Sequence, residues 1–152
     1  MGQPSYELVT SDGDMRAAFA VRRQVFVEEQ GISEELVFDD RDGKALHMVV
    51  KNRDTVVGTA RVLLLADKRA KLERMAILRP FRRKGIGSGV ISFLNGELRK
   101  RQIEQVVLHA QSEAVAFYRS CGFEESGLPF WEAGMKHRKM LRRTRDSEAQ
   151  SA

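Results

Sequence analysis

The hydrophobic positions of this chain fall into short runs that favour strands, separated by longer segments with helical spacing. Apolar or alternating runs predict strands at 6–10, 47–51, 56–65, 71–78, 105–110, 123–125 and about 135–140. The tripeptide Asn52-Arg53-Asp54 joins the second and third runs, which predicts a hairpin. The sequence therefore predicts a sheet of about seven strands.

Three segments have the spacing of amphipathic helices. The first begins at Ser11 or Asp12, which can cap a helix, and continues to about Phe26. The second covers 86–101, and the third covers 112–121 and ends at Gly122. The resulting order, βα-βββ-α-β-α-ββ, is typical of an α/β protein with a mixed sheet and not of a doubly wound fold. We expect one domain over 1–141, followed by a polar tail over 142–152.

Composition places the chain among ordinary globular proteins. It has 152 residues, of which 42% are hydrophobic and 31% charged, and a chain of this length buries roughly 70% of its unfolded surface. No window approaches the run of about 18 apolar residues that a membrane span needs, and the N-terminus lacks the pattern of a signal peptide. The single cysteine excludes an internal disulfide. We therefore expect a cytoplasmic protein that has no membrane segment.

The net charge of +5 is unevenly distributed along the chain. Residues 1–70 carry ten Lys and Arg against twelve Asp and Glu, a net charge of −2. Residues 71–152 carry sixteen against nine, a net charge of +7. Seven acids and one base lie within 28–42. A basic half predicts an anionic ligand, and the acidic segment either meets a cation or is a solvated loop.

The strongest chemical signal is the segment 72–89, LERMAILRPFRRKGIGSG. An apolar strand leads into a basic turn with Gly85 and Gly87, and a helix follows. Backbone N–H groups at a glycine turn and the positive end of a helix dipole suit a diphosphate. Lys84 stands before Gly85, which excludes a Walker A loop, and Val90 occupies the third glycine position of a dinucleotide fingerprint.

Two spaced motifs in this chain resemble those of the GNAT N-acetyltransferase superfamily. The first is Arg82-x-x-Gly85-x-Gly87 behind the strand Glu73-Arg74-Met75-Ala76-Ile77. The second is Gln111-x-x-Ala114-x-x-Phe117-Tyr118-x-x-x-Gly122-Phe123, where the family usually has asparagine in place of Gln111. The ends, Val21-Arg22-x-x-Val25-Phe26-Val27-x-Glu29-Gln30 and Gly134-x-x-His137-x-x-Met140, resemble small bacterial members.

The resemblance implies acetyl-CoA as co-substrate and a central, mostly antiparallel sheet whose fourth and fifth strands splay apart between flanking helices. Backbone groups of Met75, Ala76 and Ile77 would pair with the pantetheine arm. The turn residues Arg82, Arg83, Lys84, Gly85, Ile86, Gly87 and Ser88 would hold the diphosphate. The side chains of Gln111, Ala114 and Phe117 would border the thioester.

The same resemblance implies direct attack of an amine on the thioester, which needs few protein groups. Tyr118 matches the family tyrosine that protonates the leaving thiolate. An N–H near Ile77 is the candidate donor to the developing oxyanion. Glu73 is the leading candidate for the general base, and its alternative is an ion pair with Arg74 or Lys71.

The acceptor is the least defined part of the site. Glu28, Glu29 and His137 are candidates for binding it, and His109 is a weaker one, because a histidine in a buried strand is more often structural. The three histidines have no metal-ligand spacing, so we expect no metal. We expect a small-molecule amine or a peptide as substrate, and the resemblance leaves a homodimer open.

The alternative function is a binding protein, either a basic nucleic-acid-binding module or a non-catalytic CoA-binding module. Nucleic acid is disfavoured because the chain has one Trp and two Tyr, too few to interleave with its basic residues.

Overall fold

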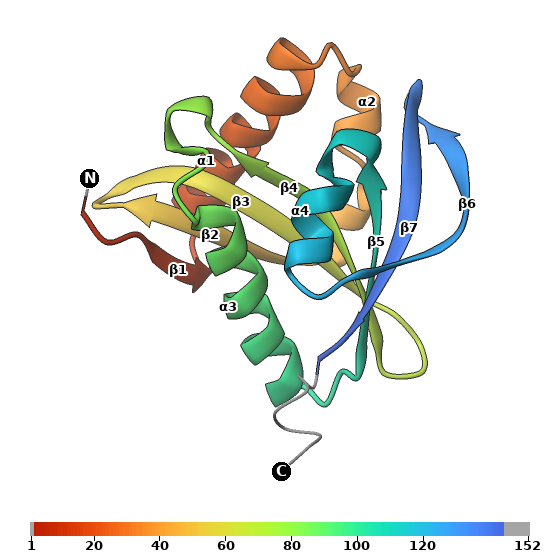
Figure 1. Ribbon diagram of the computed structural model, residues 1–152. Helices are drawn as coiled ribbons and strands as arrows, with labels where there is room; N and C mark the ends of the chain where they lie inside the picture. The colour runs from red at the N-terminus through yellow and green to blue at the C-terminus, as the bar shows by residue number, and fades with distance from the viewer. Residues whose placement is uncertain (1, 145–152) are drawn as a thin grey trace. The chain divides into compact units, whose positions relative to one another are not determined.

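The computed structural model describes residues 2–144, which form a mixed seven-stranded sheet with helices (Figure 1). The strands are β1 (Ser5–Leu8), β2 (Leu46–Asn52), β3 (Thr55–Leu64), β4 (Arg69–Ile77), β5 (Gln105–Gln111), β6 (Glu124–Glu132) and β7 (Met135–Arg143). Their order across the sheet is β1-β2-β3-β4-β5-β7-β6. The mixed α/β fold expected from the sequence is confirmed.

Several helical segments connect these strands. They are α1 (Asp12–Arg22), the π-helix η1 (Arg23–Glu29), α2 (Glu34–Val37), the 3₁₀-helix η2 (Asp40–Lys44), η3 (Arg79–Phe81), α3 (Ile86–Lys100), η4 (Ser112–Ala114) and α4 (Val115–Ser120). Ser11 caps α1 by accepting a hydrogen bond from the N–H of Asp14 at 3.1 Å. The helix predicted to reach Phe26 is therefore α1 followed by a π-helix, a form that often marks functional segments.

The chain divides into two compact units, and β4 and α3 contribute residues to both. The first unit consists of residues 2–63 with Glu73–Phe93, and the second of Leu64–Leu72 with residues 94–144. Antiparallel ladders join β1 to β2 and β2 to β3 in the first unit. Its core includes Val21, Val25 and Ala76, with Phe26, Val56 and Leu78 packed against them.

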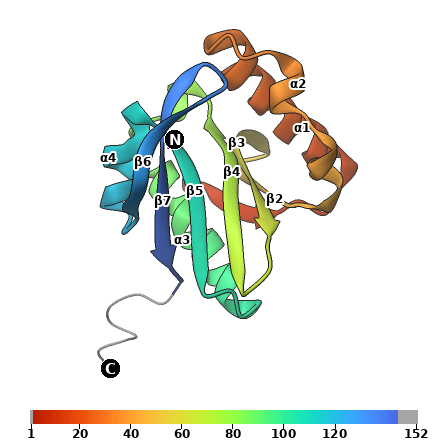
Figure 2. The same cartoon turned by 90° about the vertical axis from the view of Figure 1, so that its right-hand side faces the viewer.

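The second unit contains the only parallel ladder that is described, which pairs Arg69–Leu72 of β4 with Gln105–Leu108 of β5. Antiparallel ladders join β5 to β7 and β7 to β6, which Figure 2 shows side by side. The pairing of β6 shifts between Ser126 and Phe130, so this strand contains a bulge. Buried residues of this unit include Leu98, Leu108, Phe123 and Met140.

Two sequence-based boundaries differ from the structure. The strand expected at 123–125 is much longer, because β6 continues through the bulge to Glu132. The polar tail expected from 142 begins inside β7, where Arg142 and Arg143 pair with Val106 and Gln105. Thr144 is also buried and donates a hydrogen bond to the carbonyl of Ile103 at 2.6 Å. Residues 145–152 of the expected tail lie outside the described residues.

Candidate active site

The expected site residues fall into two groups, one in each unit. Glu28, Glu29, Glu73, Met75–Ile77 and the turn from Arg82 to Ser88 belong to the first unit, and Gln111, Ala114, Phe117, Tyr118 and His137 belong to the second.

The glycine turn has the geometry of an anion site. Gly85 has a φ of +81°, in the left-handed region that glycine adopts most readily, and the helix α3 begins at the next residue. The helical hydrogen bonds begin with the N–H of Gly89, which donates to the carbonyl of Gly85 at 3.1 Å. As at any helix start, the amides before that bond lie at the positive end of the helix dipole. The exposed Arg83 and Lys84 add positive charge there.

Arg82 has a different role from its two neighbours. Its Nε donates to the carbonyl of Ile77 at 2.7 Å, and its Nη2 contacts both carboxylate oxygens of Glu29 at 3.0 Å. Arg79 also pairs with Glu29, at 3.4 Å. Arg82 thus links the end of β4 to the end of η1, and Arg83 and Lys84 are the cations at the turn whose charge is exposed.

The strand β4 is irregular where the pantetheine contact was expected. Arg74 has a φ of +55°, an unfavourable value for a residue other than glycine. Its guanidinium donates to the carbonyls of Leu36 and Val37, at 2.8 and 3.0 Å, which stabilises this conformation. This irregular residue directly precedes Met75, which is half-buried like Ile77, whereas the Ala76 side chain is in the core.

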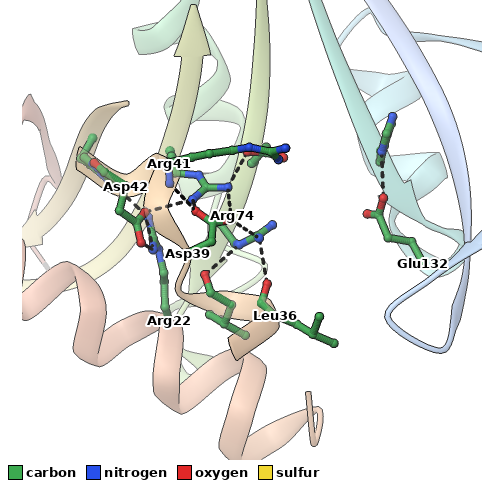
Figure 3. Close-up of polar contacts among 12 residues, drawn as sticks. Arg22, Leu36, Asp39, Arg41, Asp42, Arg74 and Glu132 are labelled. Atoms are coloured by element: carbon green, nitrogen blue, oxygen red, sulfur yellow. Dashed lines mark hydrogen bonds and ion pairs between the residues drawn. The ribbon is translucent and has the colours of Figure 1, made fainter. Parts of the chain in front are cut away.

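Glu73 takes part in a buried network of charges, the Arg61 network (Figure 3). Arg61 is fully buried and contacts Glu73 at 2.6 Å, Asp39 at 2.6 Å and Asp42 at 3.1 Å. Arg22, also fully buried, pairs with Asp42 at 2.8 Å. The partner of Glu73 that is described is therefore Arg61, a residue that sequence spacing did not single out.

The charges in the Arg61 network balance when Arg74 is included, because its Nη2 is 3.3 Å from Asp39 and three guanidiniums then face three carboxylates. Burial by itself would lower the pKa of Arg61, but the hydrogen bonds that Arg61 donates to Asp39 and Glu73 outweigh it and hold that pKa above its ordinary value. The hydrogen bond from Arg61 lowers the pKa of Asp39. The network therefore favours the charged forms of Arg61 and Asp39.

Most of the acidic segment is paired within the chain. Asp39 and Asp42 pair with Arg61. Glu34 pairs with Arg23, and Glu29 pairs with Arg82. The interpretation of the whole segment as a cation-attracting loop is thus too broad. Of its seven acids, the three that remain exposed without an ion pair in the described part of the chain are Glu28, Glu35 and Asp40.

In the second unit, Tyr118 lies on α4 with its ring against Phe117 and Phe123, at centroid distances of 5.0 and 5.8 Å. Burial of the hydroxyl, and then the nearby Cys121, raise the pKa of Tyr118 above its ordinary value. The hydroxyl is therefore protonated throughout the neutral pH range and has a proton to donate.

The segment after Tyr118 ends α4 as the sequence predicts. Gly122 has a φ of +91°, and the N–H of Phe123 donates to the carbonyl of Tyr118 at 3.1 Å, a Schellman arrangement. Phe123 is buried, so the helix end is fixed and Tyr118 sits on a well-defined support. Three expected thioester residues precede Tyr118 in the chain, and all are half-buried. They are Gln111, the last residue of β5, Ala114 in η4 and Phe117 in α4.

Two histidines of the second unit meet at one carboxylate that sequence reasoning missed. His109 Nδ1 is 3.1 Å from Glu132 Oε1, and His137 Nε2 is 3.9 Å from Glu132 Oε2. His137 is buried, and its Nδ1 is 2.8 Å from the carbonyl of Met135. The pairing register of β5, β7 and β6 brings these groups together, and no local sequence pattern indicates it.

Among residues 2–144, no three His, Cys, Asp or Glu side chains are grouped so that they could hold a metal ion. None of the helices within these residues has an apolar stretch long enough to span a bilayer.

Comparisons with known proteins agree with this arrangement of elements. Residues 11–143 match the family model of the acetyltransferase (GNAT) domain. The Bacillus subtilis protein YyaT, which is uncharacterized, is 35% identical over 132 residues, covering 85% of this chain and 88% of its own length. The uncharacterized N-acetyltransferase YjcF of the same organism is 30% identical over 136 residues, covering 89% and 96%.

Solved structures share the fold over nearly the whole chain. Escherichia coli ElaA has a TM-score of 0.82 at 24% identity, covering 92% of this chain and 99% of that chain. A GNAT acetyltransferase from Elizabethkingia anophelis, solved with acetyl-CoA bound, has a TM-score of 0.74 at 13% identity, covering 92% and 97%. The motifs around Gly85 and Tyr118, the mixed sheet and these matches lead to one conclusion: the chain belongs to the GNAT acetyltransferase family.

Proposed function

We propose that this protein is an N-acetyltransferase that transfers the acetyl group of acetyl-CoA to a primary amine of a small molecule or a peptide. The observation that carries the proposal is the glycine turn at the start of α3, with the exposed Arg83 and Lys84 beside it, in a chain of the GNAT family. Acyl transfer follows from the family, and the donor and the acceptor are the proposed part.

The residues at the turn fit a diphosphate group. Helix amides, a left-handed Gly85 and two exposed cations supply hydrogen-bond donors and positive charge at one point. In this proposal the amides from Arg83 to Ser88 hold the diphosphate, while Arg82 stabilises the turn through Ile77 and Glu29. The backbone of Met75–Ile77 pairs with the pantetheine arm, and Gln111, Ala114 and Phe117 border the thioester. The acetyl-CoA bound to the Elizabethkingia anophelis protein supports this choice of donor at the level of the fold.

When bound, acetyl-CoA supplies an activated acetyl thioester, so the protein needs to orient the groups and move protons. The acceptor nitrogen attacks the carbonyl carbon, and an N–H near Ile77 stabilises the charge that develops on the oxygen. Tyr118, whose raised pKa keeps its hydroxyl protonated, donates a proton to the thiolate that leaves. No enzyme nucleophile is required.

The leading candidate from sequence for the base that receives the ammonium proton is Glu73. In the structure its carboxylate contacts Arg61 at 2.6 Å, an ion pair that favours the charged carboxylate and opposes proton uptake. Glu73 as the base therefore stays a prediction. A charged carboxylate can also attract an ammonium group, as can the exposed Glu28 near the end of η1.

One experiment with two arms tests the proposal. Calorimetry measures binding of CoA to the wild type, to Arg83→Gln/Lys84→Gln and to the control Arg99→Gln/Lys100→Gln, which removes two exposed cations from the other end of α3. Thiol release from acetyl-CoA is then followed across a library of primary amines, for the wild type and for Tyr118→Phe. We expect weaker CoA binding in the first double variant alone, and a turnover about 10²-fold lower in Tyr118→Phe.

The possible results separate the alternatives. Binding of CoA without thiol release from any amine would favour a non-catalytic CoA-binding module. The absence of binding heat at millimolar CoA, with folded protein, would contradict the proposal altogether. Unchanged turnover in Tyr118→Phe would remove that hydroxyl from the mechanism and leave the rest of the proposal in place.

A further inference from the structure

The register of the second unit gathers polar and aromatic side chains on one face of its sheet. His109 of β5 lies opposite Lys139 of β7, and Gln111 lies opposite His137, which in turn lies opposite Phe130 of β6. Residues directly opposite one another share a face, as do residues two apart in a strand. His109, Gln111, His137 and Phe130 therefore lie on the same face. With Glu132, which joins the two imidazoles, we name His109, His137, Phe130 and Glu132 the Glu132 cluster.

Contacts within the Glu132 cluster fix the orientation of both imidazoles. The ring of Phe130 meets His109 edge-on at a centroid distance of 4.9 Å and stacks on His137 at 5.9 Å. His109 Nδ1 is 3.1 Å from Glu132 Oε1, within hydrogen-bond distance. The side chain of His137 is only 7% exposed, whereas that of His109 is 26% exposed and that of Glu132 is 47% exposed. Of the two histidines, His109 is the one that a ligand can reach.

The contact with Glu132 determines which nitrogen of His109 carries the proton in the neutral ring. A carboxylate accepts hydrogen bonds, so the Nδ1 that faces it must donate, and the lone pair is left on Nε2. A carboxylate that holds an imidazole in this tautomer is the arrangement by which histidine is prepared to act as a base. His137 differs, because its Nδ1 faces a backbone carbonyl and its Nε2 is 3.9 Å from Glu132, too far for a hydrogen bond.

The cluster is close along the sheet to a residue of the proposed thioester site in the same unit. Gln111 follows His109 by two residues on β5 and on the same face, which corresponds to about 6.6 Å along a strand. An acceptor nitrogen that approaches a thioester bordered by Gln111 is therefore within reach of the cluster. Glu73, the alternative base, has its carboxylate engaged by the buried Arg61.

We propose that His109 is the catalytic base for the acceptor amine, that Glu132 positions it, and that Phe130 provides an aromatic surface for the substrate's ammonium group. This inference rests on the proposed N-acetyltransferase function. It narrows the acceptor class to primary amines that are cationic in solution and reach the site as ammonium ions, because a ring face attracts a cation and an imidazole can then remove its proton.

The proton and electron transfers balance without a further reactant. The N–H bond of the ammonium breaks, its proton moves to Nε2 of His109, and the electron pair stays on nitrogen. That pair forms the new C–N bond, the C–S bond breaks, and the thiolate takes a proton from Tyr118. Once the amide has released its second proton, Tyr118 is reprotonated and His109 returns its proton to solvent.

Charged groups of both signs lie near His109. Glu132 contacts the ring, Lys139 is directly opposite on β7, and Lys71 is a diagonal neighbour on β4. Glu113 of η4 is exposed, and Arg119 of α4 is paired with Glu125.

The first test is kinetic and uses the full chain. The profile of kcat/KM for the amine against pH is measured for the wild type, His109→Gln, Glu132→Gln and Glu73→Gln, with Lys136→Gln, an exposed residue of β7, as the control. We expect His109→Gln to lower kcat/KM about 10²–10³-fold near neutral pH, to leave the KM for acetyl-CoA unchanged and to abolish the inflection on the acid side. Glu132→Gln should lower kcat about tenfold and displace that inflection, whereas Glu73→Gln and Lys136→Gln should keep it in place.

The second test needs no activity. Nitrogen-15 NMR distinguishes the two neutral tautomers of a histidine, and we expect His109 to be protonated at Nδ1 in the wild type and to lose that preference in Glu132→Gln. His109→Phe, which keeps a ring on the strand, separates loss of the base from loss of the packing against Phe130. Its rate should be as low as that of His109→Gln.

Several results would overturn the inference. They are an Nε2-protonated His109 in the wild type, an acid-side inflection that survives in His109→Gln, or an inflection that disappears in Glu73→Gln instead. In any of these cases the loss of activity in Tyr118→Phe would still support the proposed function. If the wild type binds no CoA or acetylates no amine, the proposed function and this inference fall together.

Discussion

The two units of this protein each contain a cluster of charged and polar side chains, and the clusters differ in balance and in exposure. In the Arg61 network the guanidiniums of Arg22 and Arg61 are fully buried and paired with carboxylates. In the Glu132 cluster one carboxylate faces two imidazoles, that of His109 at 3.1 Å and that of His137 at 3.9 Å, and His109 and Glu132 are partly exposed. A closed, balanced network holds a structure together, whereas an open one can exchange a proton with a ligand.

The exposure of each cluster has a thermodynamic consequence. Removing one member of a buried ion pair leaves an uncompensated charge in a poorly solvated place, which is costly. Removing a half-exposed carboxylate is inexpensive, because water replaces its contacts. Substitutions in the first unit should therefore affect stability most, and those in the Glu132 cluster should affect the rate and its pH dependence.

The largest expected effect on stability is that of Arg61→Met. The substitution leaves Asp39, Asp42 and Glu73 without their shared guanidinium, and we expect it to lower the free energy of unfolding by about 3–5 kcal/mol. Urea denaturation measures this value. Arg69→Met, which removes an exposed cation of β4, is the control, with an expected change below about 0.5 kcal/mol.

The same measurement on Glu132→Gln sharpens the comparison between the clusters. We expect its unfolding free energy to lie within about 0.5 kcal/mol of the wild-type value. Equal losses in Arg61→Met and Glu132→Gln would show that the two clusters do not differ in the way described. A loss in Arg61→Met no larger than that in Arg69→Met would show that the buried network contributes nothing measurable.

The next effect concerns two glycines of α3, one in each unit. A Cβ added at Gly89 would overlap the hydroxyl of Tyr6, whose ring stacks on Phe93, whereas at Gly96 nothing lies within 4 Å. Gly89→Ala should lower the unfolding free energy by about 1–3 kcal/mol because Tyr6 must move. Gly96→Ala should raise it by about 0.5–1 kcal/mol, as alanine does in an exposed helix. Thermal denaturation of both variants tests the opposite signs, and equal signs would contradict this account of α3.

The smallest effect is the pH dependence that His47 contributes in the first unit. Burial, followed by the charges of Arg22 and Arg61, lowers the pKa of His47 from its usual value of about 6.5, although Asp42 opposes this. At pH values between the two pKa values the unfolded chain binds the extra proton, so the stability from neutral His47 is complete above about pH 6.5 and is lost as the pH falls below it.

Urea denaturation between pH 7.5 and 5 measures that loss, and His47→Gln is the comparison. The slope of unfolding free energy against pH should be smaller in the variant over this range. Identical slopes would show that His47 titrates in the folded protein as it does in the unfolded chain.

Much of the fold follows from patterns that are local in sequence. The apolar run of β5, the helical spacing of α3 and the glycine that ends α4 each act over a few residues, and each element was predicted close to its observed bounds. Errors occurred where distant residues decide the outcome. The strand β6 is long because it pairs with β7 across a bulge. Its sequence includes Gly127 and Pro129, two residues that argue against a strand when the sequence is considered alone.

The candidate site shows the same division. The glycine turn at Gly85 and the position of Tyr118 could be predicted, because they depend on short motifs. The partner of Glu73 could not, since Arg61 lies on a neighbouring strand twelve residues earlier. The contact of His109 with Glu132 spans 23 residues and depends on how three strands pair.

The sequence by itself determined the order of elements, the anion-binding turn and the family, because these depend on residue type and short spacing. Only the tertiary structure decided which charges neutralise one another. It also decided that Arg82 pairs with Glu29 and that the imidazoles of His109 and His137 both face Glu132. Such pairings depend on strand register, and a shift of one residue would turn every side chain of a strand to the opposite face.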